Sequence, residues 1–118
     1  MNEELSTTSG GLRKRLDEAE VLLTVVQQLR KDLNEEEIPV PAVGEHAFEQ
    51  LRSVVLQHME DWQRKDPAAF SRAINRVDLS ERQVDHAMLR GGLRELAGDM
   101  VLRCLLKVLL RKRFAGLG

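Results

Sequence analysis

Apolar residues in the first third of the chain recur at the spacing of a helix. These residues form a stripe that proceeds in steps of four and three through Leu12, Leu16, Ala19, Leu23, Val26 and Leu33. Arg30 takes the one position where the stripe is interrupted, and Leu22 and Leu29 widen it. This pattern predicts an amphipathic helix over residues 12–33, about six turns long.

Prolines and helix caps divide the middle of the chain. Pro39 and Pro41 follow an acidic run and predict an extended connector. A second helix is expected over residues 45–64, where apolar side chains recur at Phe48, Leu51, Val55, Met59 and Trp62. Asp66 and Pro67 then start a short helix over 67–76, because the carboxylate can cap free amides and proline loses no hydrogen bond at the first helical position.

The last third contains a capping box and a long apolar helix. Ser80 and Gln83 stand three residues apart and predict a short helix over 81–90. Gly91 and Gly92 end it, and a final helix is expected over 93–114. No segment alternates like a strand. We therefore expect an all-α fold, a compact bundle of four or five helices in one domain over residues 11–115, after a flexible N-terminus at residues 1–10.

The final helix contains the stretch MVLRCLLKVLLRKRF, residues 100–114. One narrow polar stripe runs along it, through Asp99, Arg103, Lys107 and Arg111, and nearly all of the remaining girth up to Lys112 is apolar. A helix of this kind must be covered on several sides, which predicts the central helix of the bundle. A membrane span needs about twenty apolar residues, and this run is interrupted by charges well before that length.

Composition removes several function classes. The 118 residues include 18 basic and 19 acidic side chains, and a net charge of −1 gives no overall attraction to a polyanion. Cys104 is the only cysteine, so it has no partner for an internal disulfide, and its leucine neighbours predict a buried, inert thiol. The single cysteine and an N-terminus without the pattern of a signal peptide lead us to expect a cytoplasmic protein.

No residue pattern indicates a catalytic, cofactor or metal site. The histidines His46, His58 and His86 are never three or four residues apart, so no zinc-ligand spacing exists. The glycine pairs lack the lysine and the strand of a phosphate-binding loop. We therefore expect no enzyme, no cofactor and no metal.

Residues 67–90 resemble a helix-turn-helix, with two short helices joined by a tight turn. In that interpretation Asp78 stands where the motif has glycine, and Glu81 and Asp85 would face phosphates unfavourably. A well-capped helical corner is the simpler interpretation. If the segment does bind DNA, the expected contacts are base reading by Arg82, His86 and Arg90, and phosphate binding by Arg111, Lys112 and Arg113.

A wider resemblance covers roughly residues 46–114. The stretches AFSRAINRVDLSERQV and VLRCLLKVLLRKRF resemble a group of small bacterial all-helical proteins. Members have a corner of the form Arg-[Val/Ile]-Asp-[Leu/Val]-Ser-Glu, here residues 76–81, followed by a long final helix with a basic end. The resemblance implies this helix layout, with Asp78 and Ser80 shaping the corner, and it implies no active site.

The helices present more apolar surface than one bundle of this size needs. We therefore expect a protein–protein interaction or scaffold module that buries helix faces against itself, as a homodimer, or against a protein partner. The residues expected at that interface are Leu16, Leu23, Val26, Leu105, Val108 and Leu109. The alternative is a DNA-binding regulator that uses residues 67–90.

Overall fold

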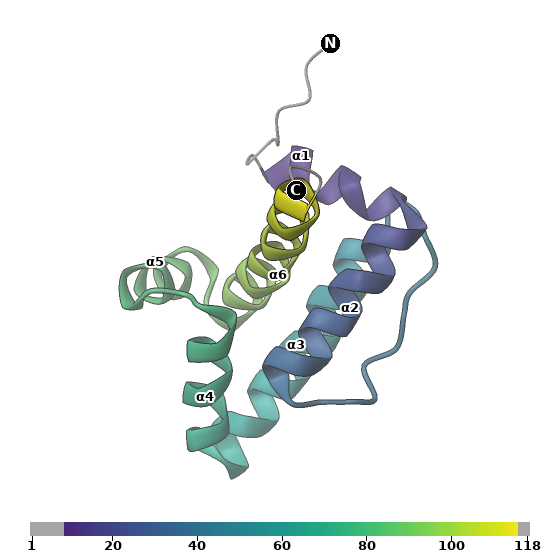
Figure 1. Ribbon diagram of the computed structural model, residues 1–118. Helices are drawn as coiled ribbons and strands as arrows, with labels where there is room; N and C mark the ends of the chain where they lie inside the picture. The colour runs from purple at the N-terminus through teal and green to yellow at the C-terminus, as the bar shows by residue number, and fades with distance from the viewer. Residues whose placement is uncertain (1–8, 116–118) are drawn as a thin grey trace.

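The computed structural model describes residues 9–115, which form helices and connecting loops without a strand (Figure 1). This confirms the all-α prediction. The helices are α1 (Ser9–Lys14), the 3-10 turn η1 (Arg15–Asp17), α2 (Ala19–Leu33), α3 (Ala47–Lys65), α4 (Pro67–Val77), α5 (Glu81–Gly91) and α6 (Leu93–Ala115). The expectation of a flexible segment at residues 1–10 falls largely on residues 1–8, which lie outside the described part.

The first predicted helix is in fact two, so the described part has six α-helices instead of four or five. Glu18 is extended, with φ −93° and ψ 116°, and the chain changes direction there between α1 and α2 (Figure 1). Leu16, just before the break, is fully buried. The break allows α1 and α2 to pack against α6 in different directions, which one straight helix spanning 12–33 cannot do.

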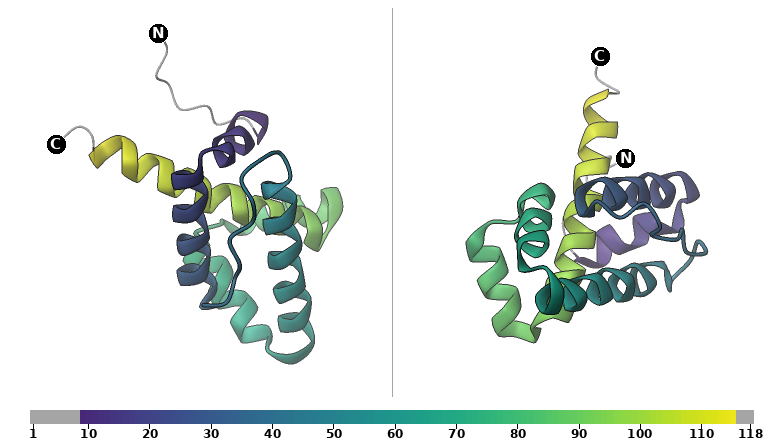
Figure 2. Two further views of the ribbon diagram at one scale, coloured as in Figure 1. Left: turned by 90° about the vertical axis from the view of Figure 1, so that its right-hand side faces the viewer. Right: turned by 90° about the horizontal axis from the view of Figure 1, so that it is seen from below.

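Helix α6 is the central element, as its sequence predicts. All five of the other α-helices contact it, and nine of its residues are buried. Figure 2 shows α6 passing through the bundle and its last turns extending beyond the other helices. Burial of each large apolar side chain contributes about 1.5–3 kcal/mol, so this helix supplies much of the hydrophobic stabilisation. No helix within residues 9–115 is both long enough and apolar enough to cross a membrane.

Helices α3 and α6 approach closely at Gly98. A Cβ atom at this position would lie 3.2 Å from Cδ of Arg52, closer than ordinary van der Waals contact, and 3.4 Å from Cζ of Phe48. The guanidinium groups of Arg13 and Arg52 lie 4.0 Å and 5.2 Å from the centre of the Phe48 ring. Because Gly98 has no side chain, α3 can approach α6 closely at this point. The side chains of Arg13 and Arg52 then cover the Phe48 ring.

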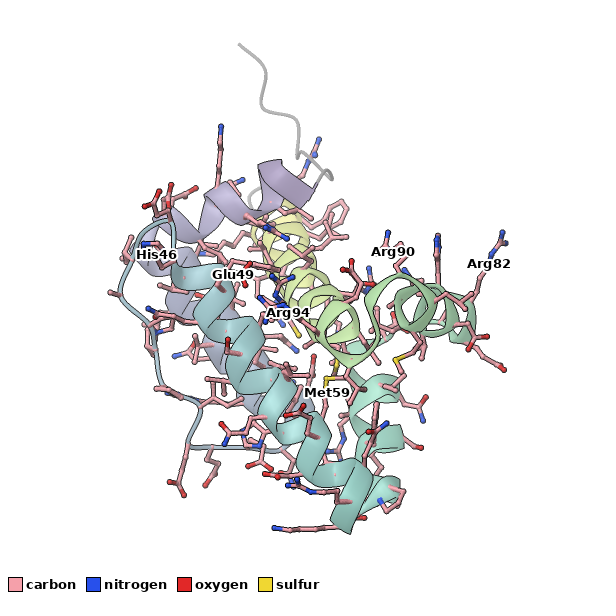
Figure 3. All side chains as sticks on the ribbon, turned by 180° about the vertical axis from the view of Figure 1, so that it is seen from behind. His46, Glu49, Met59, Arg82, Arg90 and Arg94 are labelled. Carbon is pink, nitrogen blue, oxygen red and sulfur yellow. The ribbon has the colours of Figure 1, made fainter. Side chains whose placement is uncertain are left out.

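Glu49 forms ion pairs with arginines of three helices at this end of the bundle. Its carboxylate lies 2.5 Å from Arg52 in α3, 3.0 Å from Arg94 in α6 and 4.0 Å from Arg13 in α1. Figure 3 shows Glu49 and Arg94 near one another across the α3–α6 contact. The hydrogen bond from Arg52 lowers the pKa of Glu49, so the carboxylate stays charged well below neutral pH.

The corner between α4 and α5 has the caps that the sequence predicts. Asp66 accepts a hydrogen bond of 3.2 Å from the Ala69 amide, and Ser80 accepts one of 3.1 Å from the Gln83 amide. The Gln83 side chain accepts in return from the Ser80 amide at 2.8 Å, which completes the capping box. Asp78 ends α4 in the left-handed conformation, with φ 73°. These local hydrogen bonds fix the direction of α5 relative to α4.

Candidate functional site

A groove of about 270 Å³ opens on α6 between α1 and the α4–α5 corner. Leucines form most of its lining, and three polar side chains border it. The lining residues are Leu12 from α1, Leu79 and Gln83 from the corner and α5, and Asp99, Leu102, Arg103 and Leu106 from α6. Such a mixture, an apolar floor with a few polar groups, suits the burial of another apolar side chain or helix.

Two charged side chains stand at the edge of this groove. Arg103 donates a hydrogen bond of 2.9 Å to Asp78, while its Nε atom is buried without a hydrogen-bond partner among residues 9–115. Burial, and then the nearby charge of Glu95, raise the pKa of Asp99. The guanidinium of Arg90 lies 3.9 Å from Asp99 and opposes that shift. Each of these charges therefore has an ion-pair partner within the chain, while the Nε atom of Arg103 lacks a hydrogen bond and the pair of Asp99 is a long one.

The apolar floor of the groove continues to the C-terminal end of α6. Leu102, Leu106 and Leu110 are half-buried and Phe114 is 62% exposed. These four residues, spaced four apart over about 18 Å of helix, are called the open face of α6. A second hollow of about 440 Å³ is lined by Leu110 and Phe114 together with Gln28, Lys107 and Arg111. Along these four positions α6 keeps an apolar strip in contact with solvent.

The polar stripe predicted on α6 binds the neighbouring helices. Lys107 donates to the Asp32 carboxylate at 2.9 Å and to the Arg76 carbonyl at 2.8 Å. Arg111 donates to the Gln28 side chain at 2.8 Å, and Gln28 donates to Asp32 at 2.9 Å. Gln28 and Asp32 are both buried, and each of them has a hydrogen-bond partner within this cluster. The cluster is a structural network that leaves no free acid or base.

Cys104 lies beside the same network and is buried, as predicted. Its sulfur donates to Asp32 over 3.5 Å. Burial first, and the Asp32 charge second, raise the pKa of the thiol far above its usual range. A thiol that does not ionise is neither a nucleophile nor a metal ligand. Within residues 9–115, no three His, Cys, Asp or Glu side chains are grouped closely enough to hold a metal ion.

The structure places most of the predicted interface residues inside the single chain. Leu23 is 44% exposed, but the other five are buried: Leu16, Val26, Leu105, Val108 and Leu109. In this conformation those five have no surface to offer a partner. The apolar strip of α6 that reaches the surface lies instead at Leu102, Leu106 and Leu110, which are half-buried. These residues adjoin the polar stripe, and that adjacency was the available signal, since residues at the border of a polar stripe are those a core helix leaves near the surface.

The residues of the DNA hypothesis do not form one surface. Arg82 and His86 are exposed on α5, and Figure 3 shows Arg82 projecting away from the bundle. Arg90 is 2.7 Å from Glu95 in the first turn of α6. Arg111 lies about 24 Å farther along that helix, at 1.5 Å per residue. Arg90 and the basic residues at the C-terminal end of α6 therefore lie far apart along that helix.

The basic cluster at the end of α6 is partly engaged within the chain. Arg111 binds Gln28 at 2.8 Å, and Lys112 lies 3.0 Å from Glu20 in α2. Arg113 is exposed. Opposite charges adjacent to a cationic cluster reduce its attraction for phosphate.

Comparisons with protein-family models, with curated proteins and with solved structures found no match to this chain. The geometry of the groove and of the open face of α6 is therefore the basis of the functional proposal.

Proposed function

We propose that this protein is a protein–protein interaction module that acts by burying the open face of α6 and the adjoining groove against another protein surface. The observation that carries the proposal is the continuity of that surface. Three half-buried leucines and the exposed Phe114 follow one another at helical spacing, and the groove lies over the first two. Water contact with such a strip is unfavourable, and covering it would supply the driving force for association.

The form of the site favours a helical partner. The groove has walls on two sides, from α1 and from the α4–α5 corner, and a floor made by α6. A helix with apolar residues three and four apart fits a groove of this kind, with its own side chains between Leu102 and Leu106. The chain would then act as a scaffold that holds a partner helix beside α6.

Site-specific photo-cross-linking in the native cell tests this function. A photoreactive residue is placed at Leu106 in the open face, and as a matched control at Gln63, which is exposed on α3. We expect discrete cross-linked protein products from position 106 and none from position 63. Equal yields at the two positions, or no product at either, would contradict the proposal.

DNA binding by residues 67–90 is a second candidate function, supported by the corner itself. Its turn has the left-handed residue and the capped second helix that a helix-turn-helix uses, and Arg82 and His86 are exposed on that helix. It ranks second because Glu81 and Asp85 are exposed on the same helix. Fluorescence anisotropy with duplex DNA at low salt tests it, and lack of binding under those conditions removes it.

A further inference from the structure

We propose that the partner is a second copy of this chain, and that the two α6 helices lie antiparallel along their open faces. Each projecting C-terminal end of α6 then enters the groove of the other copy. This inference rests on the proposed function, because it names the occupant of the same site.

The distribution of charge along α6 favours an antiparallel pair. Glu95 is paired with Arg90 at 2.7 Å and Arg111 is bound to Gln28 at 2.8 Å, which leaves two charges beside the open face with weaker or no pairing. Asp99, near the groove, has Arg90 at 3.9 Å, and Arg113, near the projecting end, is exposed. At 100° per residue, Arg113 lies within about 20° of Leu102 on the helix circumference, so it borders the open face. When one helix is reversed against the other, Arg113 of each copy approaches Asp99 of its partner.

A two-fold axis beside Leu106 satisfies both the apolar and the charged residues. It places Leu102 opposite the partner's Leu110, and Asp99 opposite the partner's Arg113. Phe114, which is 62% exposed in the single chain, then reaches the level of the groove in the other copy. A Phe side chain buries on the order of 150–250 Å², so the isologous contact would cover two such rings at once.

The chain carries both halves of the contact, and this is the reason to choose a second copy over an unrelated protein. At one end of the groove Asp99 has a cation, Arg90, only at 3.9 Å, and an apolar helix with a basic end can bring a second cation to it. The last turns of α6, which Figure 2 shows extending beyond the other helices, are such a helix. A foreign partner that filled only the groove would leave this projecting end uncovered.

Sedimentation velocity of the purified full chain tests the inference. We expect dimers at about 100 µM, and Leu106→Glu should raise the dissociation constant at least ~100-fold, because a charge would be buried twice across the two-fold axis. The matched control is Leu89→Glu, at an 87% exposed leucine of α5 outside the open face, which should leave association unchanged. Thermal unfolding followed by circular dichroism verifies that both variants fold.

Charge reversal tests the antiparallel arrangement without altering the apolar residues. Asp99→Lys and Arg113→Asp should each weaken self-association about 10-fold or more, since each places like charges opposite one another. An equimolar mixture of the two variants should form heterodimers, because both contacts are then attractive again. Lys112→Asp is the control, because Lys112 pairs with Glu20 in its own chain, and mixing it with Asp99→Lys should restore association less than Arg113→Asp does, since one of the two contacts stays repulsive.

The outcomes separate this inference from the proposed function. Monomers at about 100 µM, with cross-links to a different protein from position 106, would overturn the second copy as partner and leave the interaction function standing. Monomers without cross-links would overturn both. Dimers that are insensitive to Leu106→Glu, or a mixture of charge variants that stays monomeric, would also overturn the arrangement proposed here.

Discussion

The ammonium group of Lys107 lies 2.9 Å from the carboxylate of Asp32, which joins the middle of α6 to the end of α2. The same ammonium donates to the Arg76 carbonyl in α4. The Asp32 side chain is 7% exposed and the Lys107 side chain 23% exposed, so the pair is largely shielded from water. Removal of one partner leaves the other charge with fewer contacts in a poorly solvated place.

Asp32→Ala should lower the free energy of unfolding by about 2–4 kcal/mol, less than a completely buried pair because Lys107 reaches some solvent. Urea denaturation measures the change. The double variant Asp32→Leu with Lys107→Met is the control, and it should recover most of the loss because no unpaired charge remains. A change below about 0.5 kcal/mol for Asp32→Ala would show that the pair contributes little.

Asp99→Asn should stabilise the isolated chain near neutral pH. Burial beside Glu95 raises the pKa of Asp99, so the folded state favours the protonated carboxyl. The stabilisation from protonation is complete below the pKa of the unfolded chain and is lost as the pH rises through the higher folded pKa. The gain from asparagine should therefore be largest above the folded pKa and vanish below about pH 3.5. Denaturation at dilute concentration across this range measures it.

The same substitution should weaken self-association, because asparagine offers no charge to the partner's Arg113. If Asp99 had only a structural role, its substitution would not be expected to increase the stability of the fold and at the same time weaken self-association. Loss of stability at pH 7 would instead mean that pairing with Arg90 outweighs burial.

Cys104 should resist thiol reagents in the folded protein. Its side chain is buried and its raised pKa leaves almost no thiolate at pH 8. Reaction with a chromogenic disulfide should therefore be at least ~100-fold slower than in guanidinium, and should occur through opening of the structure. Labelling as fast as in the denatured chain would show that this part of α6 is open to solvent.

Asn34→Gly should increase stability by about 0.3–1 kcal/mol, since Asn34 ends α2 in the left-handed conformation, with φ 56°, where glycine has no Cβ penalty. Asn34→Ala is the matched control and should destabilise. Thermal melts of the three proteins give the order. A melting temperature for Asn34→Gly below that of the natural sequence would contradict the argument.

The helix caps could be predicted because their hydrogen bonds are local. Asp66 with Ala69, and Ser80 with Gln83, are each three residues apart, and the structure forms both. The central position of α6 could also be predicted, since a helix apolar over most of its girth is stable only when enclosed.

The break at Glu18 and the exposure of Leu23 could not be predicted from periodicity. The steps of four and three residues continue across Glu18 without glycine or proline, so nothing local marks the break. Its cause is the packing of α1 and α2 on α6, which involves residues far away in the sequence. After the break the buried side of α2 includes Leu22, Val25 and Leu29, and Leu23 turns outward. Long-range packing similarly decided which leucines of α6 remained at the surface.

The charged stripe of α6 has a consequence for the uniqueness of the fold. A rod with leucine or valine on most of its sides could rotate, or slip by a turn, and still bury nearly as much apolar area. The polar pairs prevent such rotation or slippage of α6, because they form only in one register. The pairs are Arg103 with Asp78, Lys107 with Asp32, and Arg111 with Gln28. These polar pairs therefore act mainly by raising the free energy of every packing in which α6 is rotated or displaced, so that this apolar helix has a single native position.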